Sequence, residues 1–198
     1  MRKLLLLLLI VSPFGWGKTL LIMGDSLSAG YGLKTDQTWV KLLSDKVKDQ
    51  ADGWQVVNAS ISGETTAGGL RRLPAILKEQ KPALVLIELG GNDGLRGYPI
   101  ATMQENLEKM VRLSQQAGAK VMVMEIWLPP NYGPRYLDRF KATFKTVADT
   151  TGASWLPFFG KDIALDNGMI QADGIHPTAK AQPLIMEAVW QDVSPALR

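Results

Sequence analysis

Cysteine is absent from this 198-residue chain, and histidine occurs once, at His176. The lack of cysteine excludes disulfide scaffolds, thiolate metal sites and cysteine nucleophiles. With one imidazole, a single chain cannot build a two-histidine metal site, and any mechanism that needs histidine must use His176. Low-complexity tracts are also lacking, and the 46% hydrophobic and 21% charged residues are typical of a globular protein. The length suits one ordinary domain.

The apolar run Leu4–Val11 is too short to cross a membrane, because it has eight residues and a transmembrane helix needs about 20. The basic pair Arg2–Lys3 precedes the run, and the small residues of Gly15–Gly17 follow it. This order is typical of a secretory signal that is cut before Lys18. We therefore predict a signal peptide at 1–17, a mature domain at 18–198, and export to a bacterial periplasm or the medium.

A strong charge of either sign is lacking as well. The formal net charge is +3, and removal of Arg2 and Lys3 with the leader leaves 20 basic against 19 acidic residues. A nearly neutral mature chain gives no indication of nucleic acid or of an anionic membrane as a partner. We expect no stable insertion into a membrane.

The rest of the chain alternates short apolar runs with amphipathic segments. The runs lack polar alternation, as expected for strands covered by helices on both faces. The five expected strands are Thr19–Met23, Trp54–Asn58, Ala83–Leu89, Ala119–Glu125 and Ala153–Leu156. Five such βα units predict a single-domain α/β protein, a flavodoxin-like three-layer α/β/α sandwich around a parallel sheet. For its strand order we expect 2-1-3-4-5, the commoner one at this size.

Between the runs, apolar residues recur at helical spacing. These positions are Trp39, Leu42, Leu43 and Val47; Leu107, Met110 and Val111; and Tyr136, Leu137, Phe140, Phe144 and Val147. Thr102 with Glu105 three residues later predicts a capping box at the start of a helix. A last helix is expected at about 178–191, led by Pro177.

Polar residues cluster where the predicted strands end, and ligands of such sheets bind at this edge. Ser26 follows the first strand, Gly63 the second and Asn92 the third. After the fifth strand comes a stretch of about twenty residues without periodicity, a length that is uncommon unless the loop is functional. It ends in Asp173–His176.

These residues supply what acyl transfer requires. A serine hydroxyl such as that of Ser26 becomes a good nucleophile when an imidazole takes its proton. Asp173 and His176 lie three residues apart, so the carboxylate can orient the imidazole. Gly63 allows close approach of a backbone N–H, and the Asn92 amide is a neutral donor for an oxyanion. The last loop must cross three strand spacings, roughly 14 Å, to reach Ser26.

Each block also has a purely structural interpretation. Asp25 and Ser26 can cap a short helix, and Asn92 can belong to a tight glycine turn. Asp173 can cap a helix that follows a surface His176. The convergence of four complementary blocks at one sheet edge favours the catalytic interpretation. The sequence contains neither a phosphate-binding glycine loop after the first strand nor a G-x-S-x-G elbow, so nucleotide binding and the ordinary α/β-hydrolase fold are disfavoured.

Taken together, the blocks resemble those of the SGNH (GDSL) hydrolases. They read Gly-Asp-Ser-Leu at 24–27, the Gly63 block, Gly-Gly-Asn-Asp at 90–93 and Asp-Gly-Ile-His-Pro at 173–177, in the family's order. The segments 20–32, 58–66, 90–98 and 128–133 are most similar to its bacterial thioesterase, lysophospholipase and arylesterase subgroup.

The resemblance implies a role for each matching residue. Ser26 is the nucleophile, His176 the base and Asp173 its orienting carboxylate. The backbone N–H groups of Ser26 and Gly63, with the Asn92 side chain, form the oxyanion hole. The family further implies a monomer without metal or organic cofactor, and a mobile loop at Gly94–Pro99 beside the acyl groove. An apolar substrate groove is expected from Leu95, Tyr98, Trp127, Leu128 and Tyr132, which can instead be ordinary loop packing.

The leading interpretation is a serine hydrolase that cleaves acyl esters and thioesters of small molecules, of the arylesterase, thioesterase or lysophospholipase type. Deacetylation of carbohydrate is an alternative that the same fold supports, but the apolar residues expected around the groove argue against a sugar cleft. A non-catalytic binding domain on this fold is a third interpretation, and it would be favoured by the loss of a signature residue. All four signature residues are present, so we favour the enzyme.

Overall fold

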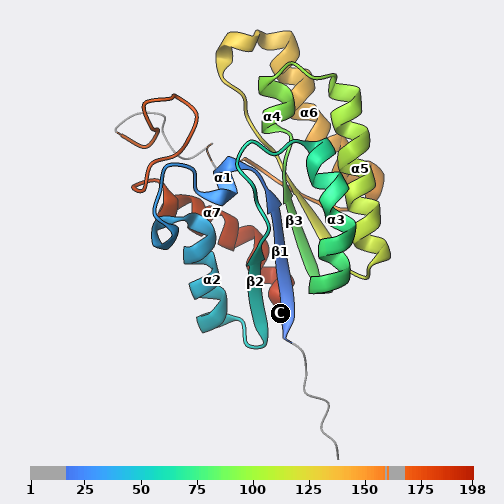
Figure 1. Cartoon of the computed structure of the whole chain (residues 1–198), viewed down its shortest axis with the longest axis vertical. Helices are drawn as coiled ribbons and strands as arrows, with labels where there is room; N and C mark the ends of the chain where they lie inside the picture. The colour runs from blue at the N-terminus through green and yellow to red at the C-terminus, as the bar shows by residue number, and fades with distance from the viewer. Residues whose placement is uncertain (1–16, 159, 161–167) are drawn as a thin grey trace, which may run out of the picture.

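The computed structural model describes residues 17–158, 160 and 168–198, and its core is a five-stranded parallel sheet (Figure 1). The strand order is β2-β1-β3-β4-β5, which confirms the predicted topology. The predicted leader lies outside the described residues except for Gly17, so its removal stays a prediction. No helix in the described ranges is both long and apolar enough to cross a membrane.

The strands fall where the apolar runs predict them. They are β1 (Lys18–Gly24), β2 (Trp54–Asn58), β3 (Leu84–Glu88), β4 (Lys120–Met124) and β5 (Ser154–Leu156). The prediction that every strand is apolar and covered on both faces is wrong for the two edge strands. In β2 and β5 several side chains are exposed, among them Gln55, Asn58 and Trp155, because an edge strand has a neighbour on one side only.

Helices connect the strands and cover both faces of the sheet (Figure 1). The α-helices are α1 (Ser26–Ala29), α2 (Trp39–Gln50), α3 (Thr66–Gln80), α4 (Gly91–Leu95), α5 (Ile100–Gln116), α6 (Pro134–Thr151) and α7 (Gln182–Val193). Short 3₁₀ turns are η1 (Thr35–Gln37), η2 (Pro130–Tyr132) and η4 (Ser194–Leu197).

Two predicted helix starts are wrong. Helix α5 begins at Ile100 with Pro99 as its N-cap, so Thr102 lies inside the helix and caps nothing. The fixed φ of proline is compatible with a helix start. Helix α7 begins at Gln182, about four residues later than expected. The backbone and hydroxyl of Thr178 are instead bonded to the carbonyls of Met169 and Gly168 in the preceding loop.

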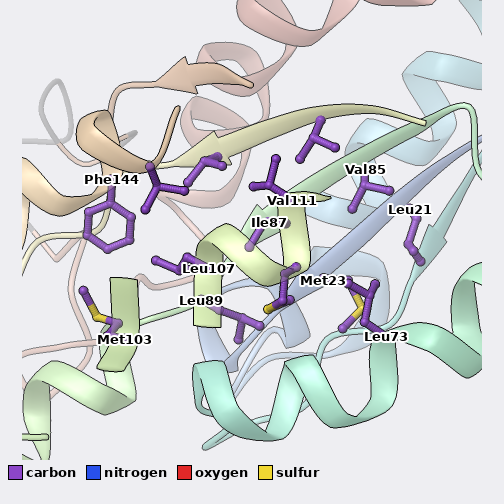
Figure 2. Packing of buried hydrophobic residues seen from close by; sticks show 14 of the residues in the cluster. Leu21, Met23, Leu73, Val85, Ile87, Leu89, Met103, Leu107, Val111 and Phe144 are labelled. Atoms are coloured by element: carbon purple, nitrogen blue, oxygen red, sulfur yellow. The ribbon is translucent and has the colours of Figure 1, made fainter. Parts of the chain in front are cut away.

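Alternate residues of the central strands face opposite layers, as the period of two requires. Leu20 and Ile22 of β1 pack with α2 and α7. Leu21 and Met23 of the same strand pack with α3, α5 and α6 (Figure 2). The second layer contains Leu73, Met103, Leu107, Val111 and Phe144. Both layers pack on β1 and β3, and these two strands are buried as far as their carboxyl ends.

Candidate active site

The loops that carry the predicted site meet at the carboxyl ends of the strands. With β1 between β2 and β3, the turn after β1 lies between the other two loops, as expected. The N–H of Ile61 donates to the carbonyl of Gly24 at 3.1 Å on one side. On the other side the Asn92 amide donates to Asp25 at 3.0 Å.

Ser26 opens the short helix α1, directly after β1. Asp25 caps this helix, since its Oδ1 accepts the N–H of Leu27 at 3.0 Å. The N–H of the first helical residue has no acceptor within its own helix, so the Ser26 N–H remains available to a ligand. The structural interpretation of Asp25 as a cap is therefore confirmed, and the cap orients the turn that carries Ser26.

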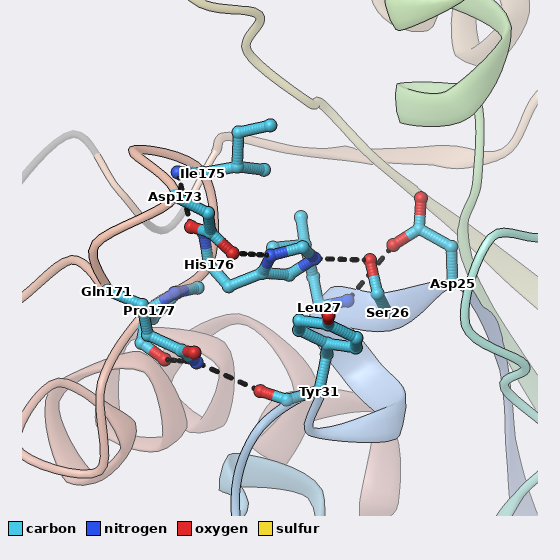
Figure 3. Close-up of polar contacts among 9 residues, drawn as sticks. All are labelled: Asp25, Ser26, Leu27, Tyr31, Gln171, Asp173, Ile175, His176 and Pro177. Atoms are coloured by element: carbon cyan, nitrogen blue, oxygen red, sulfur yellow. Dashed lines mark hydrogen bonds and ion pairs between the residues drawn. The ribbon is translucent and has the colours of Figure 1, made fainter.

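His176 joins Ser26 and Asp173 in one hydrogen-bonded row (Figure 3). Its Nε2 lies 2.8 Å from the Ser26 hydroxyl, and its Nδ1 lies 2.7 Å from Oδ2 of Asp173. The serine comes 150 positions before the histidine in the chain, so the fold and not local sequence creates this contact. The structure thus brings together the three residues that were predicted to act together.

Asp173 shapes the turn as well as facing the imidazole. Its Oδ1 accepts the backbone N–H groups of Ile175 at 2.9 Å and His176 at 3.0 Å. Partial burial by itself would raise the pKa of Asp173, but these two N–H groups and the His176 ring outweigh it and lower the pKa to about 2. Asp173 is therefore ionised at neutral pH, the state that can stabilise an imidazolium.

Gly63 lies in the loop after β2 with φ of +79°, a backbone conformation that residues other than glycine rarely adopt. The guanidinium of Arg96 donates to the Gly63 carbonyl at 3.0 Å. Arg96 follows α4, so this bond ties the loop of Gly63 to the segment after Asn92. The two predicted oxyanion donors are in this way held by contacts between their own loops.

Asn92 lies in α4, where its side-chain amide donates one N–H to Oδ2 of Asp25. An amide nitrogen carries two N–H groups, so the second one is available to another acceptor. An ionised carboxylate only accepts hydrogen bonds, so contact with Asp25 determines which end of the Asn92 amide faces it. Asp93 next to it anchors α4 to α3 through the N–H of Thr66 at 2.9 Å and its hydroxyl at 2.6 Å.

Three of the five predicted groove residues lie together around α4. Leu128 packs against Gly94, and the Tyr132 hydroxyl donates to the carbonyl of Leu95 at 2.8 Å. The ring of Trp127 packs against that of Phe158, with 5.2 Å between the ring centroids. Tyr98 is 47% exposed. Their part in acyl binding stays a prediction, as does motion of the segment 94–99.

Two residues that contact or support the histidine loop, Tyr31 and Gln171, were missed by sequence reasoning. The ring of Tyr31 lies 4.5 Å from that of His176, centroid to centroid. The side-chain amide of Gln171 donates to the carbonyls of Tyr31 at 2.9 Å and Pro177 at 3.0 Å (Figure 3). Neither residue belongs to a signature block, although Tyr31 lies within the segment similar to the thioesterase subgroup.

Two buried carboxyl groups lie beneath Ser26. Burial raises the pKa of Asp25 to about 6, although bonds from the Leu27 N–H and the Asn92 amide oppose the rise. Burial and the charge of Asp25 raise the pKa of Glu88 well above its ordinary value. Within the described ranges, no three His, Cys, Asp or Glu side chains are arranged to hold a metal ion.

Known proteins resemble this chain over most or all of its length. It is 50% identical to esterase TesA of Pseudomonas aeruginosa, with 100% of both chains aligned. It is 42% identical to thioesterase 1/protease 1/lysophospholipase L1 of Escherichia coli strain K12, over 96% of this chain and 90% of that protein. An arylesterase of Vibrio mimicus is 44% identical over 88% of this chain and 87% of that protein.

Solved structures of related proteins have the same fold. The crystal structure of TesA superposes with a TM-score of 0.87 at 52% identity, covering 91% of this chain and 100% of that one. The psychrotrophic esterase EstA from Pseudoalteromonas, inhibited by monoethylphosphonate, has the same TM-score at 48% identity and covers 91% of this chain and 98% of that one. The model of the GDSL-like lipase/acylhydrolase family matches residues 22–183. The predicted resemblance is thereby confirmed: the chain belongs to the GDSL-like lipase/acylhydrolase family of SGNH hydrolases.

Proposed function

We propose that this chain hydrolyses acyl esters and thioesters through a covalent intermediate on Ser26, with His176 as the base and Asp173 as its orienting carboxylate. The observation that carries the proposal is the row of two short hydrogen bonds from Asp173 through His176 to the Ser26 hydroxyl. A general base must lie within hydrogen-bond reach of the proton that it takes, and His176 Nε2 does.

In the acylation step the Ser26 oxygen forms a bond to the carbonyl carbon, and its proton moves to Nε2 of His176. The imidazolium lies against ionised Asp173, which stabilises the positive charge. Collapse of the tetrahedral intermediate breaks the bond to the leaving oxygen or sulfur, and this atom receives the proton from Nε2. The acyl group then remains on Ser26.

In the deacylation step water takes the place of the leaving group. Nε2 removes a proton from the water as its oxygen bonds to the acyl carbon, and returns the proton to the Ser26 oxygen when the ester bond breaks. In both steps negative charge develops on the former carbonyl oxygen. The donors proposed for it are the N–H groups of Ser26 and Gly63 and the free N–H of Asn92. They are held before the reaction, which makes such donors effective.

The relatives support the substrate class. Their names describe an esterase, an arylesterase and a thioesterase that is also a lysophospholipase, and this chain is likewise a hydrolase of ester and thioester bonds. The grouping of Leu95, Leu128 and Tyr132 around α4 is consistent with an apolar acyl group. We infer that the substrates are small molecules with an acyl ester or thioester bond and that the enzyme acts as a monomer, without a nucleic-acid partner.

Replacement of Ser26 tests the proposal directly. Ser26→Ala should abolish ester hydrolysis and labelling by a serine-directed phosphonate, because among the described residues Ser26 is the serine that bonds to His176. Ser44→Ala on α2, outside the row, is the matched control and should label normally. Undiminished turnover by purified Ser26→Ala, or a label on a different serine, would refute the assignment.

The acyl preference is measured with one panel of substrates. It contains p-nitrophenyl esters from acetyl to palmitoyl, acyl-CoA thioesters of the same lengths and a lysophospholipid, compared by kcat/KM. Hydrolysis of both ester and thioester bonds is the expected result. Activity restricted to acetylated sugars would favour the carbohydrate deacetylase instead.

Export is a further part of the proposal. A basic start, an apolar run and small residues before Lys18 support removal of residues 1–17 in a bacterial periplasm or the medium. Mass spectrometry of the exported protein should find Lys18 at its amino terminus. An intact Met1 on the exported form would contradict the signal peptide. Light scattering on the same preparation tests whether it is monomeric.

A further inference from the structure

Glu88 is a fully buried carboxyl group that the proposed reaction does not use. It is the last residue of β3, next to Gly24 in the adjacent strand β1. Its Oε2 accepts the hydroxyl of Ser28 at 2.6 Å and the backbone N–H of Asp25 at 3.3 Å. These two donors lie on either side of Ser26, so one oxygen atom holds both ends of the turn that carries the hydroxyl.

The chain leaves space for this contact at Gly24. A Cβ at Gly24 would come within 2.7 Å of Oε2 of Glu88 and of the Ser28 side chain. Real Cβ atoms do not approach other atoms so closely. The glycine that opens the Gly-Asp-Ser-Leu block is therefore required by the Glu88 carboxyl and Ser28, and any side chain there would push the turn away from β3.

The surroundings of Glu88 suit an uncharged acid. Its second oxygen, Oε1, has no hydrogen-bond partner among the described residues, and an unpaired ionised oxygen is costly to bury. Burial, with the nearby Asp25 carboxylate, raises the pKa of Glu88 well above 4.5. A protonated carboxyl still accepts two hydrogen bonds through its other oxygen, which is the role that Oε2 plays here.

The turn held by Glu88 also determines the place of Asn92. Asp25 receives the Asn92 amide at 3.0 Å, so the residue whose N–H bonds to Glu88 is the one whose side chain orients the proposed oxyanion donor. Glu88 is the last residue of β3, and Asn92 follows it by four positions, in α4. The positions of Ser26 and Asn92 thus both depend on the end of β3. Ser26 is connected to it through the hydrogen bonds of Glu88, and Asn92 through the backbone that follows the strand.

We propose that Glu88 is a positioning residue of the active site, which fixes the Asp25–Ser28 turn so that the Ser26 oxygen and the Asn92 amide keep a constant relative position. The proposal rests on the proposed roles of Ser26 and Asn92. Misplacement of a reacting group by about 1 Å can lower a rate about 100-fold, so loss of this anchor should act on kcat. It should leave KM nearly unchanged, because Glu88 is buried and cannot touch a substrate.

Two substitutions separate this role from charge and from simple bulk. Glu88→Gln keeps the shape of the side chain and an acceptor oxygen, and it carries no charge. Its kcat should therefore stay within about threefold of wild type. Glu88→Met keeps the volume and removes the acceptor, so kcat should fall between about 10-fold and 100-fold. Both enzymes are assayed on one p-nitrophenyl ester, with active sites counted by phosphonate labelling so that unfolded protein does not enter kcat.

A second pair of variants tests the same anchor from the other side. Ser28→Ala removes one of the two donors to Oε2 and should lower kcat about threefold to 10-fold at unchanged KM. Ser114→Ala is its matched control, because Ser114 is equally buried and bonds to the carbonyl of Met110 within α5. Ser114→Ala should retain the wild-type kcat. If Glu88→Met is not recovered in folded form, this pair decides the question.

The outcomes are distinct. Loss of kcat in Glu88→Met with rescue in Glu88→Gln supports the inference, and so does a lower kcat in Ser28→Ala alone. A wild-type kcat per labelled site in Glu88→Met overturns it. If Glu88→Met is not recovered in folded form, a wild-type kcat in Ser28→Ala overturns it. Equal loss in Glu88→Gln and Glu88→Met overturns it too, because the acceptor would then not suffice. If the wild-type protein neither labels at Ser26 nor hydrolyses the ester, the proposed function itself fails.

Discussion

Ser26 lies on a turn rooted in the centre of the sheet, whereas His176 and Asp173 lie on a loop at its surface. The carboxyl groups beneath Ser26 are almost completely buried, with exposed fractions of 2% for Asp25 and 0% for Glu88. In the histidine loop the Asp173 side chain is 36% exposed. The hydrogen bonds among the loop's own residues are supplemented by a bond from His176 to Ser26 and one from Gln171 to Tyr31.

This difference matches what each half has to do. The hydroxyl and the oxyanion donors must keep fixed positions while charge develops, and preorganisation of this kind needs a rigid support. The imidazole must accept a proton and release it again, so it needs a correct tautomer more than a rigid frame. The predictions below therefore perturb the two regions separately.

The largest effect is expected at the surface loop. Asp173→Asn removes the carboxylate that orients the imidazole and stabilises its charged form, and the same change in other triads lowers kcat on the order of 10⁴-fold. KM should change little. The measurement is steady-state kinetics on a p-nitrophenyl ester, with circular dichroism to verify folding. A loss of less than 10-fold in the folded variant would contradict the role of Asp173.

A smaller effect is expected at the buried side of the site, which carries Ser26 and Asn92. Asn92→Ala removes one proposed oxyanion donor and should lower kcat on the order of 10²–10³-fold, about 3–4 kcal/mol, with little change in KM. Asn92→Asp should be at least as harmful, since a carboxylate repels the oxyanion. Melting temperature and kcat are measured on one preparation. A destabilised but fully active Asn92→Ala enzyme would show that the residue only shapes α4.

The support of the histidine loop should matter less. Gln171→Ala removes the two bonds to Tyr31 and Pro177, and we expect a fall in kcat of about 10-fold through less accurate placement of His176. Gln115→Ala is a suitable control, because its amide makes a similar bond to the carbonyl of Thr151 at 2.9 Å outside the site. Equal kinetics for the two variants would mean that Gln171 does not support the loop.

The smallest effect concerns folding stability. The direction in which stability changes with pH differs between the buried carboxyl groups and the histidine loop. The raised pKa values of Asp25, about 6, and of Glu88 mean that the folded chain holds more protons than the unfolded chain above pH 4. Folding stability from this pair therefore falls as pH rises from 4, by at most about 1.4 kcal/mol per pH unit for each protonated group. The lowered pKa of Asp173 acts oppositely, and its contribution is lost as pH falls from 4 toward 2.

Thermal melts between pH 3 and pH 7 test these signs. Relative to wild type, the Tm of Glu88→Gln should rise with pH above 4, because the variant has no buried acid to keep protonated. The Tm of Asp173→Asn should fall relative to wild type as pH rises from 3 to about 4, and should keep a constant difference from wild type above pH 4. His176, Asp93 and Asn92 surround Asp25 and are unchanged in Glu88→Gln. Parallel melting curves for wild type and Glu88→Gln would contradict a raised pKa of Glu88.

Most of the fold follows from local sequence. Apolar runs bounded by turn residues predict β2 at its observed bounds. The period of 3.6 identifies part of the buried face of α2, α5 and α6, for example Leu43, Leu107 and Phe144. The start of α7 could not be predicted in this way. Thr178 is held by bonds to Met169 and Gly168, and contacts that the folded loop creates leave no local pattern.

The same limit applies to the site. The signature blocks identify Ser26, His176 and Asp173, and the structure joins them. Glu88 is the one acid in the predicted strand Ala83–Leu89, and the apolar pattern of that strand does not show what a buried acid there contacts. In the folded sheet Glu88 lies beside Gly24 of β1, and this position buries its side chain. Tyr31 and Gln171 were missed for a similar reason, because their contacts cross 145 and 140 positions of the chain.

The direction of β1 has a practical consequence. Ser26 follows its carboxyl end, and Lys18 begins its amino end, so seven strand residues at about 3.3 Å each place roughly 20 Å between them. The carboxyl terminus also lies at the amino end of the sheet (Figure 1). A solid support, a dye or a fused protein can therefore be attached at Lys18 or after Arg198 with the acyl entrance pointing away from the attachment. Immobilised enzyme held by either end should turn over substrate as fast as the free form.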